Sequence, residues 1–159
     1  MQVSLKAMNE KSFSDYRKVS IPAYAKDNVD SGRWQESESL ERSTLDFDRL
    51  LPEGVVSKNH YLFNIIENES SKNVGYIWVK LEDNIRTKSA FIYDIEINKS
   101  FRRKGYAKSG LRCIEKVVAE LGATSLGLHV FNHNSAALAL YNSMGYQTLS
   151  HNMQKTIVR

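Results

Sequence analysis

The sequence of 159 residues predicts an α/β protein of mixed α+β type, in which a central, mixed but mostly antiparallel sheet is flanked by helices. Two observations carry this prediction. The strand-like runs His60–Glu67 and Val74–Glu82 are joined by turn-forming residues, which predicts an antiparallel hairpin. Further along, a third strand-like run is followed by a basic glycine turn, a long amphipathic helix and another short strand.

The N-terminal part is expected to form a strand at Val3–Met8 and then two helical regions. The first region extends from about Ser14 to Asp30 and the second from about Glu36 to Leu51. Pro22 lies inside the first region. Because proline lacks an amide hydrogen, we expect that helix to start late or to break near Ile21.

The most informative segment follows the hairpin. The run Ser89–Ile97 is rich in β-branched and aromatic residues and ends in alternation, so it predicts a strand. Apolar residues from Ala107 to Leu121 recur at helical spacing, and Gly122 ends the helix. The basic turn around Gly105 therefore lies directly before a helix N-terminus, where free amide groups, the helix dipole and the arginines favour an anion such as a phosphate.

The spacing of this turn separates it from two known phosphate loops. A Walker A loop needs a second glycine at a fixed offset, and a dinucleotide fingerprint needs three glycines, and neither pattern is present. What fits instead is Arg102-x-x-Gly105-x-Ala107. Taken alone, this motif is equally well explained as a basic surface turn.

A second motif follows at Asn134. After a strand predicted at Ser125–Val130, the chain reads N-x-x-A-x-x-L-Y-x-x-x-G-Y, which places Ala137, Leu140 and Tyr141 on one predicted helix. With both motifs in this order, the chain resembles the GNAT acyltransferase superfamily, and in particular small bacterial acetyltransferases with similar F-I-Y-D and L-H-V-F strings. The chain is predicted to close with two strands, at Tyr146–Leu149 and Asn152–Val158, which matches the order of elements in that family.

The resemblance implies the GNAT fold and acetyl-CoA as co-substrate, with the pyrophosphate bound in the basic loop. Small residues in that loop let the backbone approach the phosphates closely. The strand before the loop would pair its main chain with the pantetheine arm and splay from its neighbour, leaving amide groups free to polarise the thioester oxygen. The residues expected to bind the coenzyme are Ile95, Ile97, Arg102, Arg103, Lys104, Gly105, Tyr106, Ala107, Lys108, Asn134, Ala137 and Tyr141.

Transfer to an amine also needs a general acid and a general base. We expect Tyr141 to protonate the departing thiolate, since a phenol and a thiol have comparable pKa values; the alternative is that its ring only packs at the end of its helix. Asp94, Glu96 and His129 are the candidate bases, and Asp94 and Glu96 share one strand face. All three have ordinary structural or solvated roles as alternatives, and a water-mediated mechanism stays open.

The acceptor pocket is expected at the junction of the first two helices. Tyr24 and Trp34 are candidate walls there, and Asp27 and Asp30 are candidate partners for an ammonium group. The same four residues are equally compatible with core or solvent positions. The family resemblance does not extend to this region, because it varies with substrate.

Composition bounds the remaining choices. With 42% hydrophobic and 25% charged residues, no apolar run of bilayer length and no apolar signal segment, we expect one globular, cytoplasmic domain over residues 1–159, without a membrane partner. The net charge of +4 is dispersed rather than gathered in a stripe, which argues against nucleic acid. Cys113 is alone, so no internal disulfide forms, and no metal-ligand spacing is visible, so no metal is expected.

The sequence therefore predicts an N-acetyltransferase that moves the acetyl group of acetyl-CoA to a primary amine of a small molecule, peptide or protein. The predicted route is direct attack in a ternary complex, without a covalent acyl-enzyme. The rival hypothesis is a non-catalytic acyl-CoA-binding sensor of the same fold. The sequence leaves the identity of the acceptor open, and also whether the protein forms a homodimer.

Overall fold

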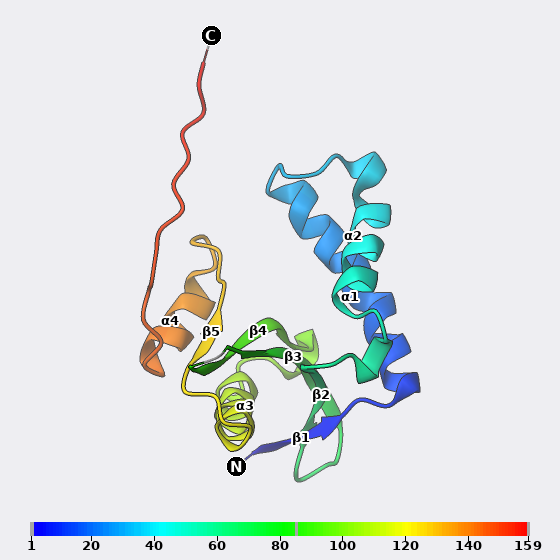
Figure 1. Ribbon diagram of the computed structural model, residues 1–159, viewed down its shortest axis with the longest axis vertical. Coiled ribbons are helices and arrows are strands. Elements are labelled where there is room, and N and C mark those ends of the chain that lie inside the picture. The colour runs from blue at the N-terminus through cyan, green and yellow to red at the C-terminus, as the bar shows by residue number, and fades with distance from the viewer. Residues whose placement is uncertain (1, 85, 159) are drawn as a thin grey trace. The chain divides into compact units, whose positions relative to one another are not determined.

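The computed structural model describes residues 2–84 and 86–158 and divides into two compact units, one up to Leu128 and one from His129 onward. The first unit contains a sheet of five strands, arranged in the order in which they occur along the chain (Figure 1). These strands are β1 (Val3–Ala7), β2 (His60–Glu67), β3 (Asn73–Asp83), β4 (Lys88–Ile97) and β5 (Leu126–Leu128). The first four run antiparallel to their neighbours, whereas β5 runs parallel to β4. The predicted mixed, mostly antiparallel sheet is thus confirmed.

Helix α3 (Tyr106–Glu120) covers one face of this sheet and contacts β1, β3 and β4. Its fully buried residues Leu111 and Ile114 belong to the same core as Ile65 and Ile77 of the central strands. The helix can approach closely because Gly110 lacks a side chain: a Cβ there would lie 3.4 Å from Ile65 Cδ1. The apolar spacing read from the sequence therefore marks the buried stripe of α3.

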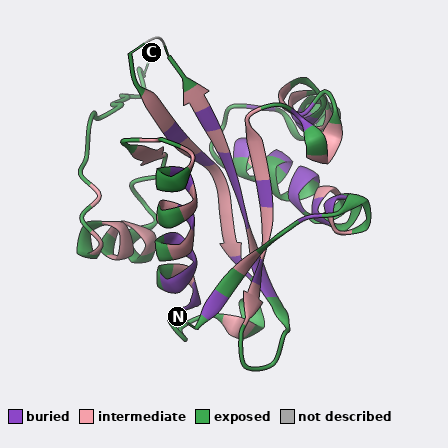
Figure 2. Cartoon of the chain, turned by 60° about the horizontal axis from the view of Figure 1, so that its bottom comes forward, coloured by how far each residue is buried: buried purple, intermediate pink, exposed green. Residues whose placement is uncertain are grey.

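Helices α1 (Glu10–Asp30) and α2 (Glu36–Leu50) cover the other face (Figures 1 and 2). A second apolar cluster lies between them and the sheet, formed by Met8, Phe13, Tyr16, Ile21, Phe47, Leu51, Leu62 and Trp78. Short 3-10 turns at Gly54–Val56 and Lys99–Phe101 complete the connections. The two helical layers bury opposite faces of β3 and β4, so residues that alternate along these strands enter different cores.

The prediction for α1 was wrong in two respects. The helix begins at Glu10, where Asn9 and Ser12 form a capping box, and it continues through Pro22 without ending. Packing outweighs the missing amide of proline, because buried Phe13 and Ile21 hold the helix against the second cluster. The Ser43 hydroxyl of α2 adds a 2.7 Å hydrogen bond to the carbonyl oxygen of Ile21, directly before the proline.

Strand β4 contains a bulge at Tyr93. Trp78 of β3 pairs with Asp94 and its neighbour Val79 pairs with Ile92, so Tyr93 is an extra residue on β4. A bulge bends its strand and breaks the alternation of side chains. Tyr93 and Asp94 consequently both lie on the α1–α2 face, where the Tyr93 ring is 5.0 Å from the Trp78 ring.

The second unit contains α4 (Ser135–Ser143), capped by the Asn134 side chain, which accepts a 3.3 Å hydrogen bond from the Ala137 amide. The two predicted strands after α4 were wrong, since the described chain beyond Met144 forms no strand. Its apolar residues Leu149 and Met153 are 93% and 88% exposed. Alternation predicts the two faces of a strand but not a neighbour, and a strand exists only when its backbone pairs with one.

Candidate active site

The basic loop joins β4 to α3 through two left-handed residues. Arg103 has φ +63° and Gly105 has φ +83°, and Gly105 is the N-cap of α3. Glycine adopts this conformation without cost, whereas a side chain here would also meet Gln2 Oε1 at 3.2 Å. The first helical hydrogen bond runs from the Ser109 amide to the Gly105 carbonyl at 3.1 Å. The amides of the first turn therefore point out of the helix without an intrahelical acceptor.

Charge and capping at this helix start both fit a phosphate group. Among the described residues, no side chain caps Gly105 and the first turn of α3 contains no acidic residue. Arg103, Lys104 and Lys108 surround the turn, and the Lys104 ammonium lies 6.0 Å from the Phe101 ring centroid. An uncapped, positively charged helix start of this kind binds anions well, so the loop suits the pyrophosphate of coenzyme A.

Arg102 differs from its basic neighbours because its guanidinium is already engaged. Its Nε donates a 2.9 Å hydrogen bond to the Ile97 carbonyl, and its Nη2 forms an ion pair with Glu96. Arg102 therefore holds the end of β4 against the loop. In this geometry Arg102 fixes the loop and adds positive charge to it, and its role in phosphate binding stays a prediction.

Strand β4 separates from β5 at the bulge. The two strands pair only over Ala90–Leu126, Phe91–Gly127 and Ile92–Leu128. From Tyr93 to Ile97, β4 has no β5 partner in the described part of the first unit. The bulge bends β4 directly after Ile92, which is where its pairing with β5 ends; the expected splay stays a prediction.

Asp94 lies at this point of separation. The Tyr16 hydroxyl of α1 donates a 2.8 Å hydrogen bond to its Oδ2 atom, and the Ile95 amide adds a backbone hydrogen bond. Burial raises the pKa of Asp94 to about 6; the Tyr16 hydrogen bond opposes that rise, and the negative charges of Glu96 and Asp27 add to it. A carboxylate with this pKa is ionised at neutral pH and is more basic than an exposed one.

Two tyrosines form the wall beside Asp94. Tyr16 is buried, and its ring lies 4.7 Å from that of Tyr76 in an edge-to-face arrangement. Burial, followed by the nearby Asp94 charge, raises the pKa of both phenols, so they remain neutral hydrogen-bond donors. The sequence analysis missed Tyr16, because no local pattern links a helix residue to a carboxylate 78 positions away.

A half-buried histidine lies further along the same face. The Trp78 indole Nε1 donates a 2.9 Å hydrogen bond to His60 Nδ1, and the His60 ring packs 5.9 Å from that of Tyr93. Burial lowers the pKa of His60, which keeps the imidazole neutral at physiological pH. This neighbourhood was also absent from the sequence prediction.

The other candidate bases have different surroundings. Glu96 lies on the same face as Asp94, opposite Tyr76, but the Arg102 guanidinium pairs with its carboxylate. His129 was expected within a strand, but β5 ends at Leu128, so that part of the prediction was wrong. In the second unit the His129 ring packs 5.0 Å from that of Phe131.

The four expected acceptor residues divide into two groups. Trp34 is buried and meets the Tyr24 ring edge-on at 5.5 Å, so this pair forms an aromatic wall between α1 and α2. Asp27 contributes to the electrostatic environment of Asp94. Asp30 is instead paired with Lys26 at 2.6 Å, one helical turn away and exposed.

Tyr141 lies in α4 of the second unit. Its ring packs edge-on against that of Tyr146 at 5.7 Å, and its carbonyl accepts a 3.0 Å hydrogen bond from the Tyr146 amide. This contact accounts for the spacing between the L-Y and G-Y pairs of the second motif. The role of Tyr141 as a general acid stays a prediction.

Two properties of the described residues concern metal sites and membrane spans. No group of three or more His, Cys, Asp or Glu side chains with the geometry of a metal site occurs among them. None of the described helices is both long and apolar enough to cross a bilayer.

Comparisons with known proteins agree with this geometry. Residues 22–146 match the model of the acetyltransferase (GNAT) family. The chain is 37% identical to the uncharacterized N-acetyltransferase YdgE and 32% identical to the uncharacterized N-acetyltransferase YycN, both of Bacillus subtilis (strain 168). The first alignment covers 99% of both chains, and the second covers 99% of this chain and 100% of YycN.

Solved structures show the same relationship. The crystal structure of YycN from Bacillus subtilis superimposes with a TM-score of 0.91, at 32% identity and over 99% of both chains. A protein of Pyrococcus furiosus reaches a TM-score of 0.65 at 26% identity, over 98% of this chain and 99% of its own. The uncapped basic loop, the separated strand and the full-length similarity to two N-acetyltransferases lead to one conclusion: this chain belongs to the GNAT acetyltransferase family.

Proposed function

We propose that this protein is an acetyl-CoA-dependent N-acetyltransferase that acts on a primary amine by direct transfer, with its two units working as one domain. One observation carries the proposal. Strand β4 presents the carboxylate of Asp94 at its bulge. The same strand then continues through the basic loop into the uncapped start of α3 at Tyr106. A base for an amine and a cradle for phosphates thus occupy one continuous segment.

Coenzyme binding is assigned to the loop and to the free edge of β4. The amides of Tyr106, Ala107 and Lys108 would hold the pyrophosphate, with Arg103 and Lys104 adding charge. The main chain of Ile95 and Ile97 would pair with the pantetheine arm, as an added strand does. Acetyl-CoA supplies the activated acetyl group, and the residues of this chain bind and orient it.

Asp94 is assigned the role of general base. Its carboxylate would take one proton from the ammonium form of the acceptor, and the neutral nitrogen would then attack the thioester carbon. The C–N bond forms and the C–S bond breaks, so the electron pair leaves with sulfur, and the nitrogen gives its second proton to bulk water as the amide forms. Glu96 is the less suited carboxylate because Arg102 occupies it.

Tyr141 is assigned the role of general acid, on the strength of its position in the second motif. Its hydroxyl would protonate the departing thiolate, and bulk water would restore the phenol. Asn134, whose side chain caps α4, would hold the start of that helix in place together with Ala137.

The deciding experiment is an amine-acceptor panel with acetyl-CoA, in which thiol release is measured. We expect release with at least one primary amine, and a loss of about 10²–10⁴-fold in kcat for Asp94→Asn. Asp15→Asn is the matched control, since Asp15 is exposed on α1 and pairs only with Lys11 in the described structure. Coenzyme binding without release from any acceptor would instead identify an acyl-CoA sensor.

A further inference from the structure

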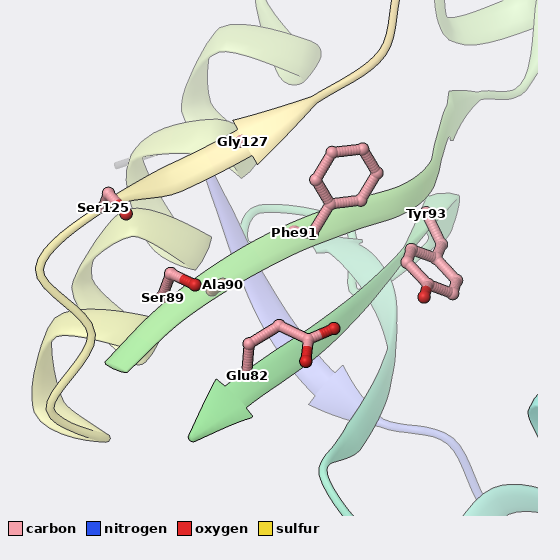
Figure 3. Close-up of a pocket in the computed structure, with 7 residues that line it drawn as sticks. All are labelled: Glu82, Ser89, Ala90, Phe91, Tyr93, Ser125 and Gly127. Atoms are coloured by element: carbon pink, nitrogen blue, oxygen red, sulfur yellow. The ribbon is translucent and has the colours of Figure 1, made fainter. Parts of the chain in front are cut away.

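A pocket of about 440 Å³ lies along the first half of β4, up to the bulge at Tyr93 (Figure 3). The rings of Phe91 and Tyr93 rise from β4, and Ser125 and Gly127 line it from β5 and the turn before it. This volume falls within the range of small-molecule sites, which is about 300–1,000 Å³. All of its lining belongs to the first unit.

The bulge accounts for the aromatic wall of this pocket. Phe91 and Tyr93 lie on one face with their rings 5.6 Å apart, and the extra residue brings Asp94 onto that face as well. Gly127 of β5 lets the Phe91 ring pack closely over it, since a Cβ there would lie 3.2 Å from Phe91 Cδ2. The pocket and the carboxylate are therefore neighbours along one strand.

Charge decides which kind of ligand fits. The single carboxylate of the lining, Glu82, is paired with Lys80 at 3.2 Å, and Lys80 is the β3 neighbour of Phe91. This pairing balances the charge at the rim, and Ser89 and Ser125 add only hydroxyl groups. Two rings on a charge-balanced rim favour a neutral, flat apolar group over a second ammonium.

We infer that this pocket binds an aromatic group of the acceptor, so that the preferred substrates are primary amines with an aromatic ring on a short linker. This inference rests on the proposed acetyltransferase function. Phe91 lies three residues before Asp94, which is about 10 Å along a strand. A linker of about two or three carbons would place the ring against the outer faces of Phe91 and Tyr93, whose own rings are in edge-to-face contact, while the amine remains beside Asp94.

The test compares 2-phenylethylamine with ethylamine as acceptors for the full-length protein at saturating acetyl-CoA. We expect kcat/KM to be at least about tenfold higher for 2-phenylethylamine, since one apolar group in a fitted pocket changes kcat/KM by about 10–200-fold. Ser125→Leu fills the pocket from an exposed position and should lower the ratio of the two kcat/KM values by about tenfold. Ser14→Leu, at an exposed position on α1, is the matched control and should leave the ratio unchanged.

Calorimetry of 2-phenylethylamine binding in the presence of coenzyme A gives a readout that does not need turnover. Weaker binding to Ser125→Leu than to Ser14→Leu supports the pocket even if no amine is acetylated, an outcome that would refute only the proposed function. Equal ratios in wild type and Ser125→Leu would overturn the inference, and so would a preference for 1,3-diaminopropane over 2-phenylethylamine. Turnover without any aromatic preference would overturn it while leaving the acetyltransferase proposal intact.

Discussion

The Tyr16 hydroxyl donates a 2.8 Å hydrogen bond to Asp94, which ties the first helix to the bulge of β4. The bond joins the element that covers the sheet to the residue to which we assign proton transfer. It holds the carboxylate on the α1–α2 face, where the bulge has placed it.

The rate should depend on pH through Asp94. Its pKa is raised to about 6, and a base must be ionised to act, so kcat/KM should rise with pH up to about 6 and then level off where this group alone controls it. A pH–rate profile of the wild type and of Asp94→Asn checks this. A rising limb near pH 6 that persists in Asp94→Asn would assign the limb to another group.

The same shift predicts a change in stability. The pKa of Asp94 is higher in the folded state than its ordinary value of 3.8, so the folded state binds the proton more tightly. This contribution to stability is present below about pH 4 and is lost as the pH rises through about 6. The free energy of unfolding of Asp94→Asn should therefore exceed that of the wild type by about 1–3 kcal/mol at pH 8, with a higher urea midpoint. At pH 4 the variant should show no such gain. Urea titrations at both pH values, with Asp15→Asn as control, measure the difference.

Tyr16→Phe should move the rising part of the pH–rate profile, which we assign to Asp94, to higher pH. The hydrogen bond from Tyr16 lowers the pKa of Asp94, so its removal should raise that pKa while leaving the base in place. We expect the limb of the pH–rate profile to shift upward and the rate on its plateau to change little. Tyr61→Phe, on the opposite face of β2, is the matched control. If the rising part of the pH–rate profile does not shift in Tyr16→Phe, Tyr16 has only a packing role.

Gly105→Glu should weaken coenzyme A binding by more than about tenfold. It places bulk and negative charge at a helix start suited to phosphate, on backbone with φ +83°. Gly32→Glu is a close control, because Gly32 has φ +80° and open space around it. Calorimetry with coenzyme A should show weak binding only for Gly105→Glu. Equal affinity in the two variants would remove the loop from the coenzyme site.

Tyr141→Phe should lower kcat by about 10²–10⁴-fold with little change in coenzyme affinity. Removing the hydroxyl preserves the ring contact with Tyr146, so the fold should be retained. The defect should shrink with an acyl donor whose thiol is more acidic, because such a thiolate needs less help to leave. Tyr146→Phe removes the hydroxyl of the neighbouring ring and serves as control. Turnover near wild type in Tyr141→Phe would return Tyr141 to a packing role.

Local patterns predicted the elements that local forces form. The hairpin of β2 and β3 and the helix after Gly105 follow from alternation, helical spacing and turn residues, and the structure contains both. The continuity of α1 through Pro22 did not follow, because it depends on packing against a sheet that is assembled later in the chain. Propensity is a weak guide wherever tertiary contacts decide.

The candidate site shows the same division. The basic loop was found from its glycine spacing and Asn134 from the second motif, and both lie at helix starts with a local signature. Tyr16, Tyr76 and His60 were not found, because they meet Asp94 and Tyr93 only through the folded sheet. The face that Tyr93 occupies was equally hidden, since regular alternation places it opposite Asp94.

The extra residue in β4 also divides the strand into two halves that can vary separately. Before Tyr93 the strand lines a pocket, and after it the strand carries Asp94 and leads into the loop. Substitutions at Ser89 or Phe91 would reshape the pocket without altering the register that aligns Asp94 with Trp78. New acceptor specificities could therefore be obtained by substituting residues in the first half of β4, while the second half, which carries Asp94, is left unchanged.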